Sequence, residues 1–181
     1  MPNTDYLRYL EELRQIPTLS GFENAGQKEV QQLLAPLFDE SRPAGVSGLL
    51  FTKKCSRENA PVLLIDAHLD EIGLIVTDLK DDGTLTVSSL GGMDARTYTA
   101  SSYTIHGKEN MPALSLKKPY CLGGPEARKL PKNGEFWLFT GFTKEELIQK
   151  GVAVGTPVSM ERSTESLSEE QLCGAYMDDK S

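Results

Sequence analysis

The sequence is poor in cysteine and tryptophan, and each scarcity argues against a class of protein. Its three cysteines, Cys55, Cys121 and Cys173, stand far apart and form no C-x-x-C pair. They therefore predict reduced cytoplasmic thiols and not a disulfide framework or a zinc knuckle. A single tryptophan among 181 residues leaves little for a sugar-binding platform. Because no pair of acids placed for glycoside hydrolysis is apparent either, we disfavour a carbohydrate hydrolase.

Long apolar runs and basic clusters are also missing. No stretch approaches the ~18 consecutive apolar residues of a membrane-spanning helix, and the first fifteen residues, MPNTDYLRYLEELRQ, contain no signal-peptide core. The net charge of −7, without any dense run of lysine and arginine, argues against a nucleic-acid surface. The sequence thus predicts a soluble cytoplasmic protein that binds neither membranes nor nucleic acids.

The first seventy residues predict helices followed by strands. Apolar residues recur at helical spacing over residues 5–16, and Thr4 is a suitable N-cap. Ser20 and Glu23 have the spacing of a capping box for a second helix that reaches about residue 38, with Pro36 marking its end. A short strand is predicted over residues 46–53.

A run of branched apolar residues, 62–67, predicts a buried strand that ends in a polar cluster. His68, Asp70 and Glu71 follow it directly. Ligand sites in open α/β sheets lie at the carboxyl ends of strands. A carboxylate two residues from a histidine can accept one ring N–H, which makes the other ring nitrogen a better metal ligand. The alternative is an ordinary solvent-facing strand end, which is the commoner context of an isolated His-x-Asp.

From Ile72 onward the pattern changes to short apolar runs divided by turns. Asp81-Asp82-Gly83 predicts a hairpin, and a helix over 145–150 is predicted between a Thr143 cap and Gly151. Further strands are predicted over residues 99–105, 113–116, 135–139 and 156–160. The single tryptophan, Trp137, is expected in a core. About ninety residues should therefore form small β structure.

Two further groups could carry chemistry. Asp178 and Asp179 form an acidic pair, and paired acids with an imidazole suit zinc, cobalt or manganese. Such pairs are more often solvated loop residues, so both interpretations stay open. His106, the second of only two histidines, is expected at a surface or strand edge and not in a ligand role.

Taken together, several segments resemble one family. They are SGFE after the first helix, VLLIDAHLDEIGLIV, DGTLTVSSLGGMDAR, KEELIQKGVAVGTPV and the final GAYMDDKS. In this order the chain resembles the cytosolic di-metal aminopeptidases of glutamyl or leucyl type, which form tetrahedral shells and some of which have been labelled endoglucanases. The resemblance spans nearly the whole chain and is most specific at AHLDEIG.

The resemblance implies a fold and a site. The fold class would be α/β, a zinc-peptidase-like catalytic domain with an inserted, barrel-like β domain that makes dimer contacts. Residues 1–71 and 163–181 would belong to the catalytic domain and 72–162 to the insertion. His68 would bind one of two divalent ions, zinc or cobalt, Asp70 would orient His68, and Asp178 would bridge the two ions.

The resemblance also implies that part of the site is missing. The family's catalytic glutamate pair and its remaining ligands follow the Asp-Asp pair, whereas these 181 residues end three positions after Asp178. The expected function is a metal-dependent aminopeptidase that acts on short peptides and assembles through residues 72–162. The alternative is an inactive fragment or paralogue that serves as an assembly module, and the isolated chain is expected to be inactive. A catalytic domain cut in this way should expose apolar surface.

Overall fold

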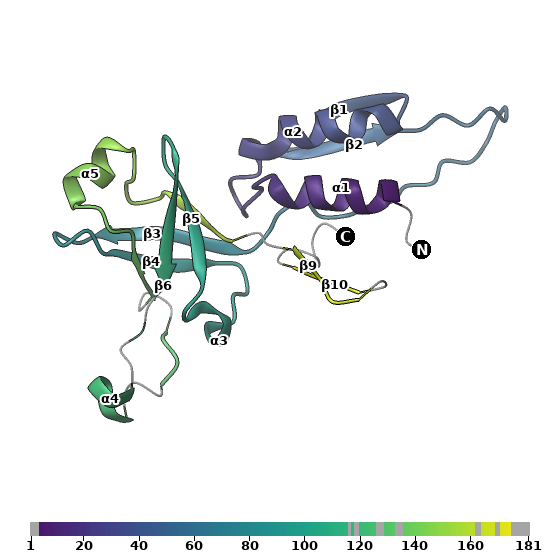
Figure 1. Ribbon diagram of the computed structural model, residues 1–181. Coiled ribbons are helices and arrows are strands. Elements are labelled where there is room, and N and C mark those ends of the chain that lie inside the picture. The colour runs from purple at the N-terminus through teal and green to yellow at the C-terminus, as the bar shows by residue number, and fades with distance from the viewer. Residues whose placement is uncertain are drawn as a thin grey trace. The chain divides into compact units, whose positions relative to one another are not determined.

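The computed structural model describes residues 4–115, 117, 120–125, 129–132, 136–161, 164–168 and 171–174 (Figure 1). By its internal contacts the chain divides into two units, Met1–Glu71 with Arg162–Ser181, and Ile72–Glu161. Over the described ranges, no helix combines the length and the apolar character that a membrane crossing requires.

The helices of the first unit lie where the apolar spacing predicts them. Helix α1 spans Thr4–Gln15, helix α2 spans Asn24–Leu34, and a 3₁₀ turn η1 continues α2 over Ala35–Leu37. The predicted end at Pro36 is confirmed, because this proline lies in η1. Thr4 is the first residue of α1 instead of a cap in front of it. Leu10 of α1 and Val30 of α2 are buried, so both helices turn an apolar face inward.

A two-stranded hairpin packs against α2. Strands β1, Glu40–Ala44, and β2, Gly48–Thr52, are antiparallel. The Nε2 amide of Gln27 donates to the Gly48 carbonyl at 2.9 Å, and that of Gln31 to the Ser41 hydroxyl at 3.2 Å. The predicted strand over 46–53 is thus confirmed as β2, whereas its partner β1 was not predicted. Two short strands, β9 (Thr164–Ser166) and β10 (Leu172–Gly174), form another antiparallel pair.

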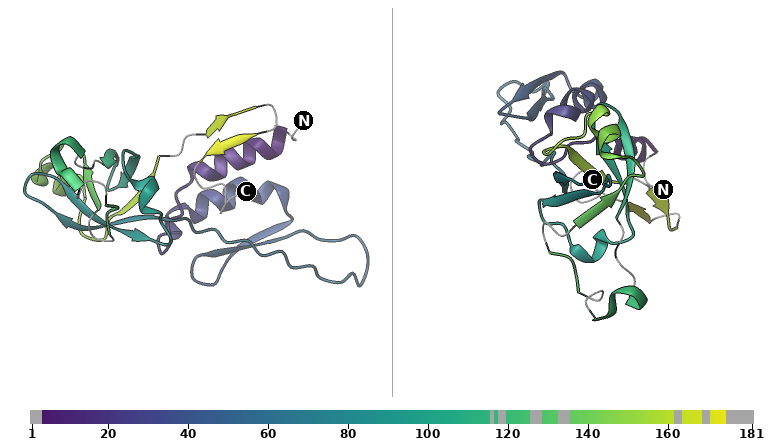
Figure 2. Two further views of the ribbon diagram at one scale, coloured as in Figure 1. Left: turned by 90° about the horizontal axis from the view of Figure 1, so that it is seen from below. Right: turned by 90° about the vertical axis from the view of Figure 1, so that its left-hand side faces the viewer.

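The prediction of a strand over residues 62–67 is wrong. This segment runs without strand structure along the open loop that follows β2 (Figure 2). Its apolar side chains are exposed, with 96% of Val62 and 83% of Ile65 accessible. A strand exists only where a neighbour takes up its backbone hydrogen bonds, and no strand in the described part of the chain pairs with this segment. The expected exposure of apolar surface is therefore found here.

The second unit is a closed six-stranded antiparallel barrel in the order β3-β4-β7-β6-β5-β8. Closure leaves no edge with unpaired backbone groups. The predicted hairpin at Asp81–Gly83 joins β3 to β4, and Gly83 has a φ of +80°. A Cβ there would also collide with the Phe142 carbonyl oxygen, so glycine is required twice over. The six strands are β3 Gly73–Leu79, β4 Leu85–Leu90, β5 Ser102–His106, β6 Asn110–Ser115, β7 Phe136–Phe139 and β8 Pro157–Met160.

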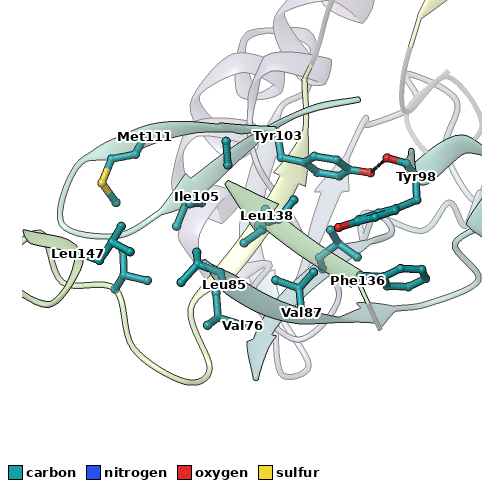
Figure 3. Close-up of a cluster of buried hydrophobic side chains, with 14 residues drawn as sticks. Val76, Leu85, Val87, Tyr98, Tyr103, Ile105, Met111, Phe136, Leu138 and Leu147 are labelled. Atoms are coloured by element: carbon teal, nitrogen blue, oxygen red, sulfur yellow. Dashed lines mark hydrogen bonds between the residues drawn. The ribbon is translucent and has the colours of Figure 1, made fainter. Parts of the chain in front are cut away.

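Alternation along the strands builds the barrel core. In β6 and β7 every second residue is buried, so one face of each strand points into the barrel (Figure 3). Aromatic rings fill one end, where Tyr98 lies with its ring centroid 4.3 Å from that of Phe136. The hydroxyl of Tyr103 donates to the Tyr98 carbonyl at 3.3 Å. Burial raises the pKa of Tyr103 to about 12, so this hydroxyl stays protonated.

Short helices connect the barrel strands. Helix α5, Lys144–Gln149, begins with the predicted cap, because Thr143 and Glu146 form a reciprocal capping box. It ends at Gln149, and the predicted glycine stop follows at Gly151, which has a φ of +82°. Helices α3 (Ala95–Tyr98) and α4 (Tyr120–Gly123) were not predicted.

Candidate functional site

The polar cluster after residue 67 is held by a short parallel pairing with the turn between α1 and α2. The Glu71 amide donates to the Thr18 carbonyl at 3.0 Å, and the Ser20 amide donates to the Glu71 carbonyl at 3.0 Å. Leu19 and Glu71 thereby form a parallel bridge. We call residues 18–20, paired in this way with residues 69–71, the brace.

Side chains reinforce the brace from within. The Thr18 hydroxyl donates to the Leu69 carbonyl at 2.8 Å, and the Thr18 amide donates to the Glu71 carboxylate at 3.2 Å. Glu71 is only 1% exposed. A buried carboxylate needs such donors, because leaving it unsolvated and unbonded would be costly. Glu71 therefore anchors the cluster from the interior of the first unit.

His68 is oriented through one ring nitrogen. Its Nδ1 lies 3.1 Å from the backbone carbonyl oxygen of Asp70 and 3.4 Å from the Asp70 Oδ1. The backbone carbonyl oxygen can only accept, so in this hydrogen bond Nδ1 carries the hydrogen, and in the neutral ring Nε2 then carries the lone pair. The side chain of His68 is 59% exposed and that of Asp70 is 43% exposed. This tautomer and exposure are those of an imidazole that can ligate a metal ion through Nε2.

Ser20 does not cap α2, so the capping-box prediction is wrong. Helix α2 begins at Asn24, and Glu23 occupies its N-cap position. Ser20 therefore lies too far before the helix for its hydroxyl to cap it. The Ser20 hydroxyl instead donates to the Asp70 Oδ2 at 2.9 Å. The Glu23 carboxylate accepts from the Gly21 amide at 2.9 Å.

The structure describes only part of the expected metal site. Asp178 and Asp179 lie outside the described residues. Within the described ranges, no group of three or more His, Cys, Asp or Glu side chains is arranged to hold a metal ion. An imidazole such as that of His68 is a suitable ligand for a divalent transition metal. Among the residues that the structure describes, His68 is the oriented candidate ligand.

His106 takes part in the barrel's hydrogen bonding. Its Nε2 lies 2.9 Å from the Ser159 hydroxyl, and its Nδ1 lies 3.1 Å from the Asn110 Oδ1. Ser159 is buried. His106 thus joins the end of β5 to β8 and to the first residue of β6.

An apolar patch on the outside of the barrel was missed by the sequence reasoning. Leu114 of β6 and Phe139 of β7 are direct cross-strand partners, and Trp137 lies two residues before Phe139 on the same face. All three are exposed, Trp137 by 48%, so the prediction that this tryptophan is a core residue is wrong. β7 reads Phe-Trp-Leu-Phe, and a wholly apolar strand does not reveal which face is buried.

Comparisons with known proteins identify relatives of this chain. The family model of the M42 glutamyl aminopeptidases matches residues 48–181. The lysyl aminopeptidase of Pyrococcus furiosus is 25% identical over 94% of this chain and 50% of its own length. The structure of the aminopeptidase APDkam598 from Desulfurococcus kamchatkensis covers 90% of this chain and 45% of its own, with 26% identity and a TM-score of 0.79.

A third relative shares the fold at lower identity. The TET1 peptidase of Pyrococcus horikoshii, which can assemble into a tetrahedron or a large octahedral shell, is 22% identical with a TM-score of 0.73, over 89% of this chain and 48% of its own. The chain thus spans half or less of the length of these relatives. The family match covers most of the chain, including the His68–Glu71 cluster and the whole barrel, and the chain therefore belongs to the M42 glutamyl aminopeptidase family.

Proposed function

We propose that this chain contributes to a metal-dependent aminopeptidase that releases N-terminal residues from short peptides. The observation that carries the proposal is the orientation of His68, whose Nδ1 faces two oxygen atoms of Asp70. Membership of an aminopeptidase family supports the reaction class. On this proposal the first unit is part of an α/β catalytic domain of the zinc-peptidase type.

Three residues of this chain have roles in the proposed site. His68 would hold one of two divalent ions, zinc or cobalt, through Nε2, and Asp70 would keep the imidazole in the required tautomer. Asp178 would be shared by both ions. Bound ions of this kind lower the pKa of a coordinated water and polarise a peptide carbonyl. The buried Glu71 holds the backbone of the cluster in place and takes no part in proton transfer.

The barrel would be the assembly domain. The patch of Leu114, Trp137 and Phe139 offers neighbouring exposed apolar side chains on adjacent strands. Patches of this kind commonly mark interfaces, and aromatic residues are enriched there. A second copy of the chain is the proposed partner, in line with the shells formed by the Pyrococcus horikoshii relative.

The cysteines support a cytoplasmic location. Cys55, Cys121 and Cys173 are all exposed and form no disulfide. Exposed thiols of this kind persist in reducing compartments. A cytoplasmic location is part of the proposal.

Metal binding and peptidase activity measured on one sample would test the proposal. Zinc, cobalt and manganese would each be titrated into the metal-free protein, and turnover would be followed with a panel of N-terminal aminoacyl reporters. His68→Ala should weaken binding of the first ion by at least 10–100-fold, the loss seen even for residues that merely support a ligand. His106→Ala is the matched control and should bind as the wild type does.

Each outcome has a definite meaning. Equal loss of metal binding in both histidine variants, or in neither, would contradict the role of His68. Metal binding through His68 without turnover would favour the assembly-module interpretation for the chain on its own. Trp137→Ser should reduce self-association in analytical ultracentrifugation, and an unchanged sedimentation profile would contradict the proposed interface.

A further inference from the structure

The ladder between β6 and β7 ends beside the apolar patch on the outside of the barrel. β6 ends at Ser115, whose partner in β7 is Leu138, and Leu114 pairs with Phe139. Trp137, which precedes Leu138 in β7, therefore lies beyond the end of β6. Backbone groups at such a point take their hydrogen bonds from side chains or from water.

A buried tyrosine supplies one of these bonds. Tyr98, the last residue of α3, donates its hydroxyl to the Trp137 carbonyl at 2.5 Å. The centroid of its ring lies 4.3 Å from that of Phe136 and 5.7 Å from that of Tyr103 (Figure 3). Burial raises the pKa of Tyr98, so the hydroxyl remains a donor throughout the neutral pH range.

The backbone of Tyr98 is held as well as its ring. Its carbonyl accepts from the Tyr103 hydroxyl at 3.3 Å and from the Ser115 hydroxyl. Because Ser115 is the last residue of β6, Tyr98 is bonded to the end of β6 through its carbonyl and to β7 through its hydroxyl. One buried residue thus continues the connection between two strands where their ladder stops.

This connection acts on the patch through Trp137, which forms it together with Leu114 and Phe139. Tryptophan is enriched among the residues that carry most of the binding energy of an interface. A contact residue that is already held in one conformation loses less entropy on association. A fixed Trp137 backbone therefore favours association through the patch.

We propose that Tyr98 is a positioning residue of the assembly surface, whose hydroxyl fixes the backbone of Trp137 and so preorganises the patch for a second copy of the chain. The inference rests on the proposed function only in naming the second copy as the partner. The bond between Tyr98 and Trp137 lies within one chain and can be tested in the absence of association.

Trp137 reports on its own mobility, because it is the only tryptophan among the 181 residues. Tyr98→Phe removes the hydroxyl and keeps the ring that packs in the core. At a concentration low enough for sedimentation velocity to show single copies, this variant should increase the amplitude of fast local motion in the fluorescence anisotropy decay of Trp137. In a concentration series, it should weaken self-association by about fivefold or more, the factor for the net loss of one hydrogen bond.

Tyr103→Phe is the matched control. It removes another buried hydroxyl from the same end of the barrel, and that hydroxyl donates to the Tyr98 carbonyl and not to Trp137. Urea unfolding of both variants measures the accompanying loss of stability. Tyr103→Phe should keep the wild-type anisotropy decay and association constant even where it lowers the free energy of unfolding.

The proposal is overturned if Tyr98→Phe leaves the anisotropy decay of Trp137 unchanged, or if Tyr103→Phe changes it equally. It is also overturned if Tyr98→Phe mobilises Trp137 without weakening self-association. Trp137→Ser tests the proposed interface separately. If Trp137→Ser sediments as the wild type does, the second copy is not the partner of the patch and that part of the proposal falls, while the anisotropy decay still decides whether Tyr98 positions Trp137.

Discussion

Replacing Gly26 by alanine tests whether the brace is set by close packing of α2. Gly26 is the third residue of this helix, and an added Cβ would lie 2.5 Å from the Pro17 carbonyl oxygen and 2.5 Å from the Ile16 Cγ2. The first of these atoms belongs to the backbone. The chain immediately before Thr18 must therefore move for the methyl group to fit.

Two opposing free-energy terms set the size of the effect of Gly26→Ala on stability. Alanine is a better helix former than glycine by about 0.8–1 kcal/mol. Overpacking a tight site costs about 1–3 kcal/mol of stability. Because the added methyl group at Gly26 would lie 2.5 Å from a backbone atom, we expect a cost toward the upper end of this range. The net expectation is a destabilisation of the brace by roughly 1–2 kcal/mol, because the steric cost exceeds the helical gain.

Hydrogen exchange reads out this change locally. The amides of Ser20 and Glu71, whose bonds form the brace, should lose protection by about 5–30-fold in Gly26→Ala, the factor that corresponds to 1–2 kcal/mol. Gly92→Ala is the matched control, because no atom lies within 4 Å of a Cβ there and the backbone imposes no positive φ. Unchanged or increased protection in Gly26→Ala would refute the reasoning.

Three further predictions concern the barrel unit. Leu138→Ala should cost about 2–5 kcal/mol in urea unfolding, because this side chain is fully buried, whereas Leu114→Ala on the adjacent strand should cost under about 1 kcal/mol; equal losses would contradict the assigned faces. Arg96 holds the pKa of Asp94 down at about 2 from an ordinary 3.8, so its stabilisation is present above about pH 4 and is lost as the pH falls through 2. Arg96→Gln should raise the Asp94 midpoint toward 3.8 in a carboxyl NMR titration, and an unmoved midpoint would exclude the guanidinium as the cause. Thr143→Ala should cost about 1 kcal/mol of unfolding free energy through loss of the capping box while Thr143→Ser costs little, and equal losses would argue against the hydroxyl.

Features that depend on neighbouring residues were predictable. The helical spacing of α1, the turn at Asp81–Gly83 and the Thr143 cap of α5 each arise within a few positions, and the structure has all three. The His68 and Asp70 pair belongs to the same class, because a two-residue separation already allows the ring nitrogen to reach Asp70 oxygens. Local stereochemistry is sufficient to predict each of these features.

Features that need a distant partner were predicted wrongly or not at all. Residues 62–67 have a strand's composition, yet a strand also requires a hydrogen-bonding neighbour, and composition does not supply one. Ser20 has the spacing of a helix cap, but its hydroxyl donates to a carboxylate 50 positions away. Trp137 was expected in a core, and the all-apolar sequence of β7 does not reveal which of its faces turns inward.

The sequence by itself determined the local elements and the change to β structure at Ile72. Only the tertiary structure decided that six strands close into one barrel and that residues 18–20 pair with residues 69–71. The physical reason is that pairing between remote segments is chosen by the packing and hydrogen-bond satisfaction of the whole unit. No single stretch of the chain contains that information.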